Sequence, residues 1–135
     1  MPHLTRLIQL EDGERRRSPR YLVPDDELLV VGVAVMDSQD RPRTLTGRVR
    51  DISATGLSLL LPTSEACGEL AERGVTLAVV LTLPSGVVRL RAEVAHCAGR
   101  LGRGGILAGY LVGVRISEID EDDHDRLVEY IGERS

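Results

Sequence analysis

The sequence contains no lysine, asparagine, phenylalanine or tryptophan, and all 17 of its basic residues are arginine. Schiff-base catalysis and the phosphate-binding loop GxxxxGK[ST] both require a lysine, so these two classes of enzyme are excluded. Arginine without lysine, together with the missing residue types, is the pattern expected of a GC-rich coding bias. We therefore expect a bacterial source.

Cysteine is scarce and long apolar runs are absent. Cys67 and Cys97 lie far apart and form no CxxC motif, so the sequence supports neither a structural zinc site nor a disulfide framework, and we expect two buried free thiols. No apolar stretch approaches the roughly 20 residues that span a bilayer, and the polar start carries no apolar signal core. We expect a soluble, cytoplasmic protein with no membrane insertion, no metal and no cofactor.

The length of the chain bounds its domain count. With 135 residues, 42% of them hydrophobic, the chain can build one ordinary core, whereas two domains would each be too small to be stable. The sequence predicts a single domain over residues 14–135, preceded by residues 1–13 as an N-terminal tail or an extra element.

Alternating and β-branched apolar residues predict about six strands. In one of them, alternation places Asp51 and Ser53 on the same face as Leu45 and Val49. The clearest hairpin is joined by the sequence PSG. The Gly-rich segment 98–109 is predicted to be a mobile hairpin loop. The predicted strands cover residues 28–36, 45–53, 57–61, 75–83, 87–97 and 110–116.

The end of the chain changes to a helical period. Ile119, Leu127 and Ile131 fall at helical spacing, and Asp120 is a candidate N-cap. The acidic residues that follow it suit the positive end of a helix dipole. Gly132 is a candidate stop.

The order of these elements indicates the fold class. Many short strands and one terminal helix, without βαβ alternation, predict a mainly β protein built as a small antiparallel barrel. Residues 65–73 are a candidate short helical turn.

Two short motifs carry the chemistry. Arg16 and Arg20 stand at RxxxR spacing within ERRRSPRY, and DISATG, from Asp51 to Gly56, lies at a turn between two predicted strands. An arginine fork grips a guanine edge or a phosphate in bidentate fashion, and its flat face can stack on a base. Asp51 and Ser53 share a parity, so a carboxylate and a hydroxyl project together, and Gly56 permits a positive φ or a close backbone approach.

In this order, inside a chain of short strands, RxxxR and DxSxxG resemble the two signatures of the PilZ domain, the bacterial receptor module for cyclic di-GMP. The spacing, the strand order and the closing GVRISEIDEDDHDRLVEYI are similar to that family over about residues 14–133. The resemblance implies a six-stranded antiparallel β-barrel of the split-barrel type with a C-terminal α-helix. It also implies a cyclic di-GMP site formed by Arg15, Arg16, Arg20, Asp51, Ser53 and Gly56.

The ligand's chemistry agrees with these residue types. Cyclic di-GMP has two guanines and two phosphates, so its receptor needs donors to guanine O6 and N7, charge for phosphate, and acceptors for the guanine N–H groups. In PilZ-like proteins an arginine directly before RxxxR, here Arg15, is compatible with a stacked pair of ligands. We therefore expect two cyclic di-GMP molecules per chain.

The leading hypothesis is a non-enzymatic receptor whose arginine arm orders on binding and whose altered surface is read by a partner protein or within a homodimer. A first alternative is a PilZ-like adaptor that binds the second messenger weakly or not at all. A second is a small barrel for single-stranded nucleic acid. That function would require a continuous groove and stacking aromatics, so no DNA or RNA partner is expected.

Structural interpretations of the same residues also stay open. The arginine cluster can be a solvated tail paired with residues 25–27, and Asp51 and Ser53 can hydrogen-bond a local turn, which is compatible with binding. His96 beside Cys97 is interpreted as an ordinary surface or core position, because adjacent strand residues point to opposite faces and no third metal ligand is evident.

Overall fold

The computed structural model describes residues 7–8, 20–36, 41–63 and 74–134. Arg15, Arg16, Cys67 and the candidate helical turn at 65–73 lie outside these residues. The described elements are β1 (Leu7–Ile8), β2 (Arg20–Leu22), β3 (Val30–Met36), β4 (Pro42–Ser53), β5 (Gly56–Leu61), β6 (Thr76–Leu83), β7 (Gly86–Leu101), a 3-10 turn (Arg103–Gly105), β8 (Leu107–Asp120) and α3 (Glu121–Arg134).

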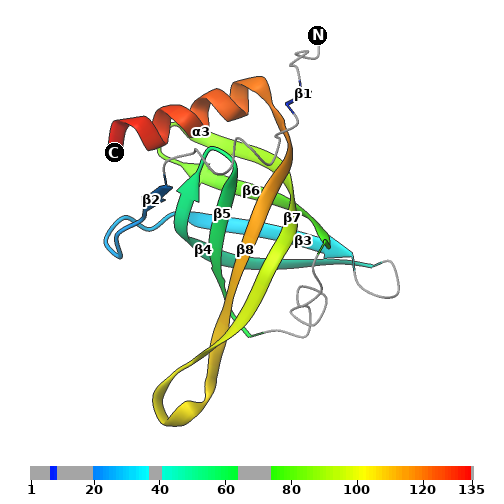
Figure 1. The fold of residues 1–135 in the computed structure, drawn as a ribbon, viewed down its shortest axis with the longest axis vertical. Helices are drawn as coiled ribbons and strands as arrows, with labels where there is room; N and C mark the ends of the chain where they lie inside the picture. Colours follow the sequence, from blue (N-terminus) through cyan, green and yellow to red (C-terminus); the bar gives the residue numbers. More distant parts are fainter. Residues whose placement is uncertain (1–6, 9–19, 37–40, 64–73, 135) are drawn as a thin grey trace.

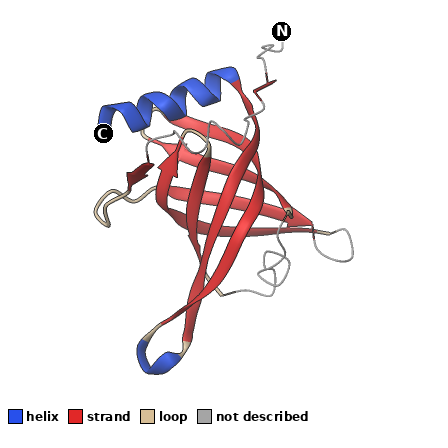
Figure 2. Cartoon of the chain, in the orientation of Figure 1, coloured by secondary structure: helices blue, strands red, loops and turns tan. Residues whose placement is uncertain are grey.

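Six strands form a closed antiparallel barrel in the order β8-β5-β4-β3-β6-β7, and pairing of β7 with β8 closes it (Figures 1 and 2). Closure removes the sheet edges that would otherwise expose unpaired backbone groups. Two short strands add to this wall, because β1 pairs with β8 and β2 pairs with β4. The predicted six-stranded barrel with a C-terminal helix is confirmed.

The core fills the barrel with aliphatic side chains from alternate positions of each strand. The hairpin of β6 and β7 follows the predicted alternation, since every second residue from Leu77 to Leu83 and from Val88 to Val94 is buried. Beyond Val94 the alternation breaks, because the pairing of β7 with β8 shifts register between Val94 and His96. Cys97, of the opposite parity, is half-buried and packs against the core.

Helix α3 lies across one end of the barrel, as Figure 1 shows. It begins directly after Asp120, as predicted, and carries three acidic residues in its first turn. Two details of the prediction are wrong. Ile119 belongs to β8, where it pairs with Leu90, and the helix continues through Gly132 to Arg134, because a glycine with helical backbone angles does not end a helix by itself.

The β7–β8 hairpin projects from the other end of the barrel (Figure 1). Residues 98–109 were predicted to be a loop, but most of them are strand, because their backbones continue the β7–β8 ladder out to Leu101 and Leu107. Only the turn around Arg103–Gly105 lies outside this ladder, and Gly104 in that turn has a φ of 70°. Glycine lowers strand propensity, yet ladder pairing overrides it here.

Candidate functional site

A β-bulge in β4 turns Asp51 and Ser53 away from the core. The pairing of β4 with β5 shifts register between Val49 and Asp51, so Val49 and Ile52, of opposite parity, both point into the barrel. The prediction that Asp51 and Ser53 share the face of Val49 is therefore wrong. They share a face with each other, as predicted, but it is the outer face of the barrel.

Ser53 builds the turn between β4 and β5. The backbone N–H groups of Thr55 and Gly56 donate hydrogen bonds to its Oγ at 3.3 and 3.1 Å, and Ser53 itself is 1% exposed. A serine hydroxyl in this position satisfies backbone donors that the turn leaves without a strand partner. The turn-building interpretation of Ser53 thus holds in the free protein.

Gly56 is required for close packing and not for an unusual backbone. Of the two predicted reasons for this glycine, a positive φ does not apply, and a close backbone approach does. A Cβ built on Gly56 would lie 2.8 Å from the carbonyl oxygen of Val114 on β8. The bare glycine lets β5 begin directly against its neighbour.

Arg20 meets Asp51 on this outer face. β2 pairs with β4 in a register that opposes Arg20 to Ser53 and Leu22 to Asp51. The Arg20 guanidinium forms a hydrogen-bonded ion pair with Oδ1 of Asp51, with the Arg20 side chain 55% exposed and that of Asp51 10% exposed. Within the described residues, the partner of the second RxxxR arginine is thus the DxSxxG aspartate and not the acidic segment 25–27.

A clasp formed by Tyr21, Glu27, Tyr130 and Arg134 holds β2 against α3. The hydroxyls of Tyr21 and Tyr130 donate to the Glu27 carboxylate at 2.6 and 2.5 Å, and the Arg134 guanidinium forms an ion pair with it. The two rings meet edge to face at 5.9 Å, and Arg134 lies 3.8 Å above the Tyr130 ring. The clasp fixes the residue next to Arg20.

These contacts shift the pKa values of Glu27 and Tyr130. Hydrogen bonds from the Tyr130 and Tyr21 hydroxyls lower the pKa of Glu27 from 4.5 to about 2. Burial, followed by the hydrogen bond to Glu27, raises the pKa of Tyr130. Glu27 is therefore a carboxylate at neutral pH.

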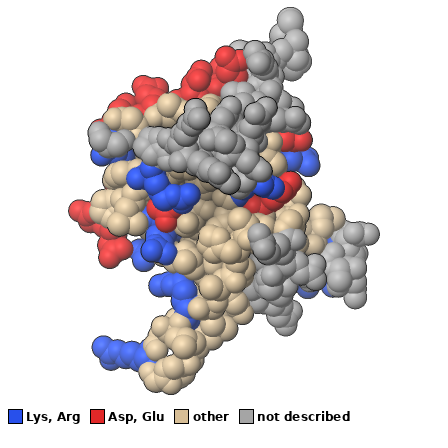
Figure 3. Space-filling model, in the orientation of Figure 1, with Lys and Arg blue, Asp and Glu red and all other residues tan. Residues whose placement is uncertain are grey.

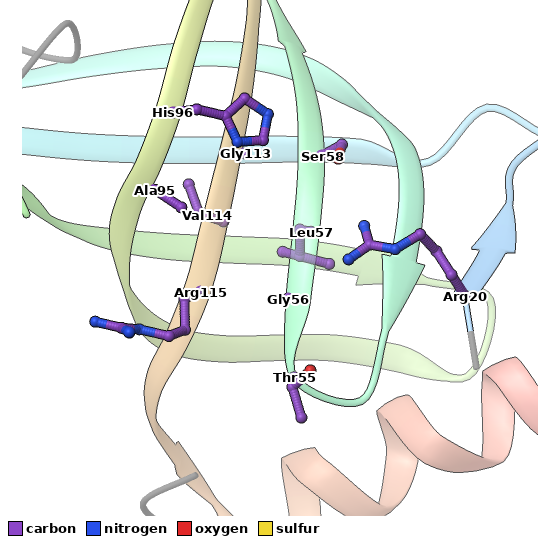
Figure 4. A pocket seen from close by; sticks show the side chains of 10 residues that line it. All are labelled: Arg20, Thr55, Gly56, Leu57, Ser58, Ala95, His96, Gly113, Val114 and Arg115. Carbon is purple, nitrogen blue, oxygen red and sulfur yellow. The ribbon is translucent and has the colours of Figure 1, made fainter. Parts of the chain in front are cut away.

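A cavity of about 280 Å³ opens beside the Arg20–Asp51 pair on the outer wall. Arg20 and Gly56 line it, whereas Asp51 and Ser53 lie next to it, behind the arginine and the turn. The other lining residues come from the turn, β5, β7 and β8, and Figure 4 shows their side chains. They are Thr55, Leu57, Ser58, Ala95, His96, Gly113, Val114 and Arg115.

The floor of the cavity is part of a row of paired residues across four strands, which starts at Asp51 beside the cavity. Asp51 pairs with Ser58, Ser58 with Gly113, and Gly113 with His96. Beside this row, Arg115 forms an ion pair with Glu93 of β7. The small side chain of Ser58 and the bare Gly113 leave the cavity open between the charged side chains of Arg20 and Arg115. Such a space suits a flat polar ligand with negative charge.

Sequence reasoning missed Ser58, His96 and Arg115. They come from three strands that meet only when the barrel closes, so no short motif links them. Strand alternation predicts that their side chains face outward, but an outward-facing side chain need not belong to a site.

Charge is unevenly distributed over the molecule. Figure 3 shows acidic side chains along the helix end and arginines over the barrel wall and the projecting hairpin. Within the described ranges, no three His, Cys, Asp or Glu side chains are placed to hold a metal ion. In the same part of the chain, no helix is both long and apolar enough to cross a bilayer.

Comparison with known proteins agrees with this fold. The chain superimposes on the PilZ domain with c-di-GMP of YcgR from Escherichia coli with a TM-score of 0.67 at 18% identity, covering 89% of this chain and 91% of that one. It matches the Bacillus subtilis inhibitor of motility (MotI/DgrA) with a TM-score of 0.64 at 19% identity, over 89% of this chain and 50% of that one. The MrkH complex with c-di-GMP from K. pneumonia gives 0.66 at 17% identity, over 88% and 52%.

At these identities the likeness shows the fold, and the chain spans only about half of the second and third structures. No curated protein matches the sequence. The family model described as the PilZ domain matches residues 14–133. The chain, with its barrel, its terminal helix and its RxxxR and DxSxxG motifs, belongs to the PilZ domain family.

Proposed function

We propose that this protein is a non-enzymatic receptor for cyclic di-GMP and that the ligand binds in the cavity beside Arg20. The observation that carries the proposal is the contact between the two motifs, because the Arg20–Asp51 ion pair brings them together at the rim of one cavity. Two solved structures of similar fold, the YcgR domain and MrkH, contain c-di-GMP, which supports the same ligand here.

The groups at the rim match the ligand. The Arg20 guanidinium offers several N–H donors in a planar fork for phosphate or for guanine O6 and N7. The Asp51 carboxylate accepts up to about four hydrogen bonds, so pairing with Arg20 leaves capacity for guanine N–H groups. Arg15 and Arg16, outside the described residues, are proposed to close over the ligand from the arm that precedes β2.

Signalling is proposed to follow from ordering of that arm. Ligand bound between the arm and the barrel wall changes the surface next to β2, and a partner protein or a second copy of the chain reads the change. No catalytic step is part of this function, and we propose that the protein acts in the cytoplasm.

Stoichiometry is a separate part of the proposal. We propose two stacked cyclic di-GMP molecules per chain, because Arg15 adds donors and positive charge that a pair of ligands with about four phosphate charges would use. Replacing Arg15 with leucine is expected to reduce the stoichiometry to one. If the unaltered chain binds only one ligand per chain, the stacked pair is ruled out and the proposed receptor function remains.

Equilibrium dialysis with cyclic di-GMP tests the site. Arg20→Ala is expected to weaken binding at least tenfold, since a charge-assisted hydrogen bond contributes about 1.5–3 kcal/mol and about 1.4 kcal/mol is a factor of ten. Arg89→Ala, which removes an exposed arginine of β7 that does not line the cavity, is the matched control. Equal losses in both variants would indicate general electrostatic attraction, and no loss in Arg20→Ala would place the ligand elsewhere.

A further inference from the structure

The cavity has a second wall that neither motif provides. In Figure 4 the imidazole of His96 and the guanidinium of Arg20 reach toward one another from opposite sides, over β8 and β5. Arg115 also lines the cavity but points away from its centre in the same view. His96 is thus the side chain that faces Arg20 across the site.

Gly113 makes room for this arrangement. Gly113 pairs with His96, and a Cβ built on it would lie 1.9 Å from Cε1 of His96 and 2.5 Å from each ring nitrogen. The imidazole therefore occupies the space that a side chain at position 113 would fill. Aromatic rings that cover a glycine of a neighbouring strand are a known device for packing on a sheet.

The ring is available to a ligand. His96 is exposed, and neither of its ring nitrogens has a hydrogen-bond partner among the described residues. It is also the one aromatic ring among the described residues that line the cavity. Bases in open sites are held by stacking on such rings as well as by hydrogen bonds to their edges.

We propose that His96 contacts the bound nucleotide directly and forms the planar wall on which a guanine base stacks opposite Arg20. This inference rests on the proposed function and adds to it a binding residue outside both motifs. It assigns the base to the β7–β8 side of the cavity and the arginine fork to the β2–β4 side.

The other polar side chains around the cavity already have partners. Arg20 is paired with Asp51, and Arg115 with Glu93, so each arginine that lines the cavity has a carboxylate beside it. His124 of helix α3 has its Nε2 3.3 Å from the carbonyl oxygen of Ala54 in the turn.

Calorimetric titration of the full chain with cyclic di-GMP tests the proposal. His96→Ala should weaken binding at least fivefold. His96→Tyr keeps a planar ring at this position, so it should keep most of the affinity. Arg89→Ala, at an exposed position of the same strand that does not line the cavity, is the control and should bind as the unaltered chain does.

A double-mutant cycle with Gly113 separates contact from indirect effects. Gly113→Ala should weaken binding in the unaltered background, because the new Cβ displaces the His96 ring, and should have no further effect in His96→Ala. Thermal midpoints should stay within a few degrees, since the displaced group is the end of a side chain.

Three results would overturn the proposal. If His96→Ala binds as tightly as the unaltered chain, His96 is not a contact, and the receptor function still stands. Additive effects of Gly113→Ala and His96→Ala would show that the ring does not act through the space above Gly113. If the unaltered chain binds no cyclic di-GMP, the proposed function fails and this inference fails with it.

Discussion

Asp51 and Ser53 differ in what they do for the free protein, although they are two residues apart and share a face. Ser53 is buried and accepts two backbone hydrogen bonds that shape the turn. Asp51 instead holds Arg20, whose side chain is more than half exposed. Within one motif, Ser53 therefore shapes the turn, and Asp51 places a negative charge beside Arg20.

This division predicts different costs of substitution. Ser53→Ala should lower the free energy of unfolding by about 1–3 kcal/mol, because it leaves the N–H groups of Thr55 and Gly56 without their acceptor in a buried turn. Asp51→Asn should cost about 1 kcal/mol or less, since ion pairs with an exposed partner contribute little. Urea denaturation measures both values.

For Asp51→Asn we expect a large effect on ligand binding, in contrast to its small effect on stability. Asp51→Asn is expected to weaken cyclic di-GMP binding at least tenfold, because it removes a charged acceptor and releases Arg20. If Asp51→Asn instead unfolds the protein as readily as Ser53→Ala and binds normally, the carboxylate serves only the local structure.

Single residues also mark the limit of what periodicity predicts. The pairing of Asp51 and Ser53 on one face followed from their spacing, but the face itself depended on the bulge after Val49, which alternation cannot reveal. Gly56 was predicted from its motif, and its reason, the carbonyl of Val114, lies 58 positions further along the chain. His96 was interpreted as an ordinary position, and its pairing with Gly113 on another strand could not be predicted from the sequence around it.

Among the elements, β2 and α3 are joined by the clasp around Glu27. Because β2 carries Arg20 at its first position, the clasp connects the C-terminal helix to the proposed ligand site. The Glu27 carboxylate, with three donors around it, ties β2 to the helix, in addition to the pairing of β2 with β4.

The clasp should make stability depend on pH. The pKa of Glu27 is lowered to about 2 in the folded state from an ordinary value of 4.5, so its contribution is complete above about pH 4.5 and is lost as the pH falls toward 2. Glu27→Gln should therefore be less stable than the unaltered chain at pH 7, by about 1–3 kcal/mol. The difference should shrink to nearly zero at pH 2.

Thermal unfolding followed by circular dichroism between pH 2 and pH 7 measures this effect. Glu129→Gln, at an exposed position of α3, is the control and should show no such convergence. A constant difference between Glu27→Gln and the unaltered chain across the range would show that Glu27 acts by packing and not by charge.

Helix α3 offers a second prediction. Gly132 lies inside the helix, and a Cβ there meets no atom within 4 Å, so Gly132→Ala should stabilise the protein by about 0.5–1 kcal/mol. Gly104→Ala is the matched control, because it has equal space but a φ of +70°, and it should not stabilise. Differential scanning calorimetry compares the two midpoints, and a lower midpoint for Gly132→Ala would contradict this account of the helix end.

The sequence predicted the strands well where buried and exposed residues alternate. It predicted them poorly where pairing with a neighbouring strand holds residues of low strand propensity. The hairpin of β6 and β7 follows its sequence pattern closely, since each buried residue is apolar. The outer part of β7 and β8 does not, because glycines and arginines at 98–109 carry no alternation and the strands persist through their pairing with each other. The end of α3 shows the same limit, as Gly132 alone does not stop a helix.

In the whole molecule, the barrel separates three surfaces. The helix lies across one end, the β7–β8 hairpin projects from the other, and the candidate site lies on the wall between them (Figure 1). Each surface is built on the same closed ladder, and the clasp adds a direct connection from the site's strand to the helix. The fold class followed from strand count and order, whereas the site required closure of the barrel.

Isothermal titration of the purified chain tests most directly whether cyclic di-GMP binds in this cavity. We predict saturable binding with two ligands per chain at saturation and at least tenfold weaker binding for Arg20→Ala and Asp51→Asn, each folded as judged by circular dichroism. Absence of any saturable heat, with no rise in the thermal midpoint at high ligand concentration, would contradict the claim.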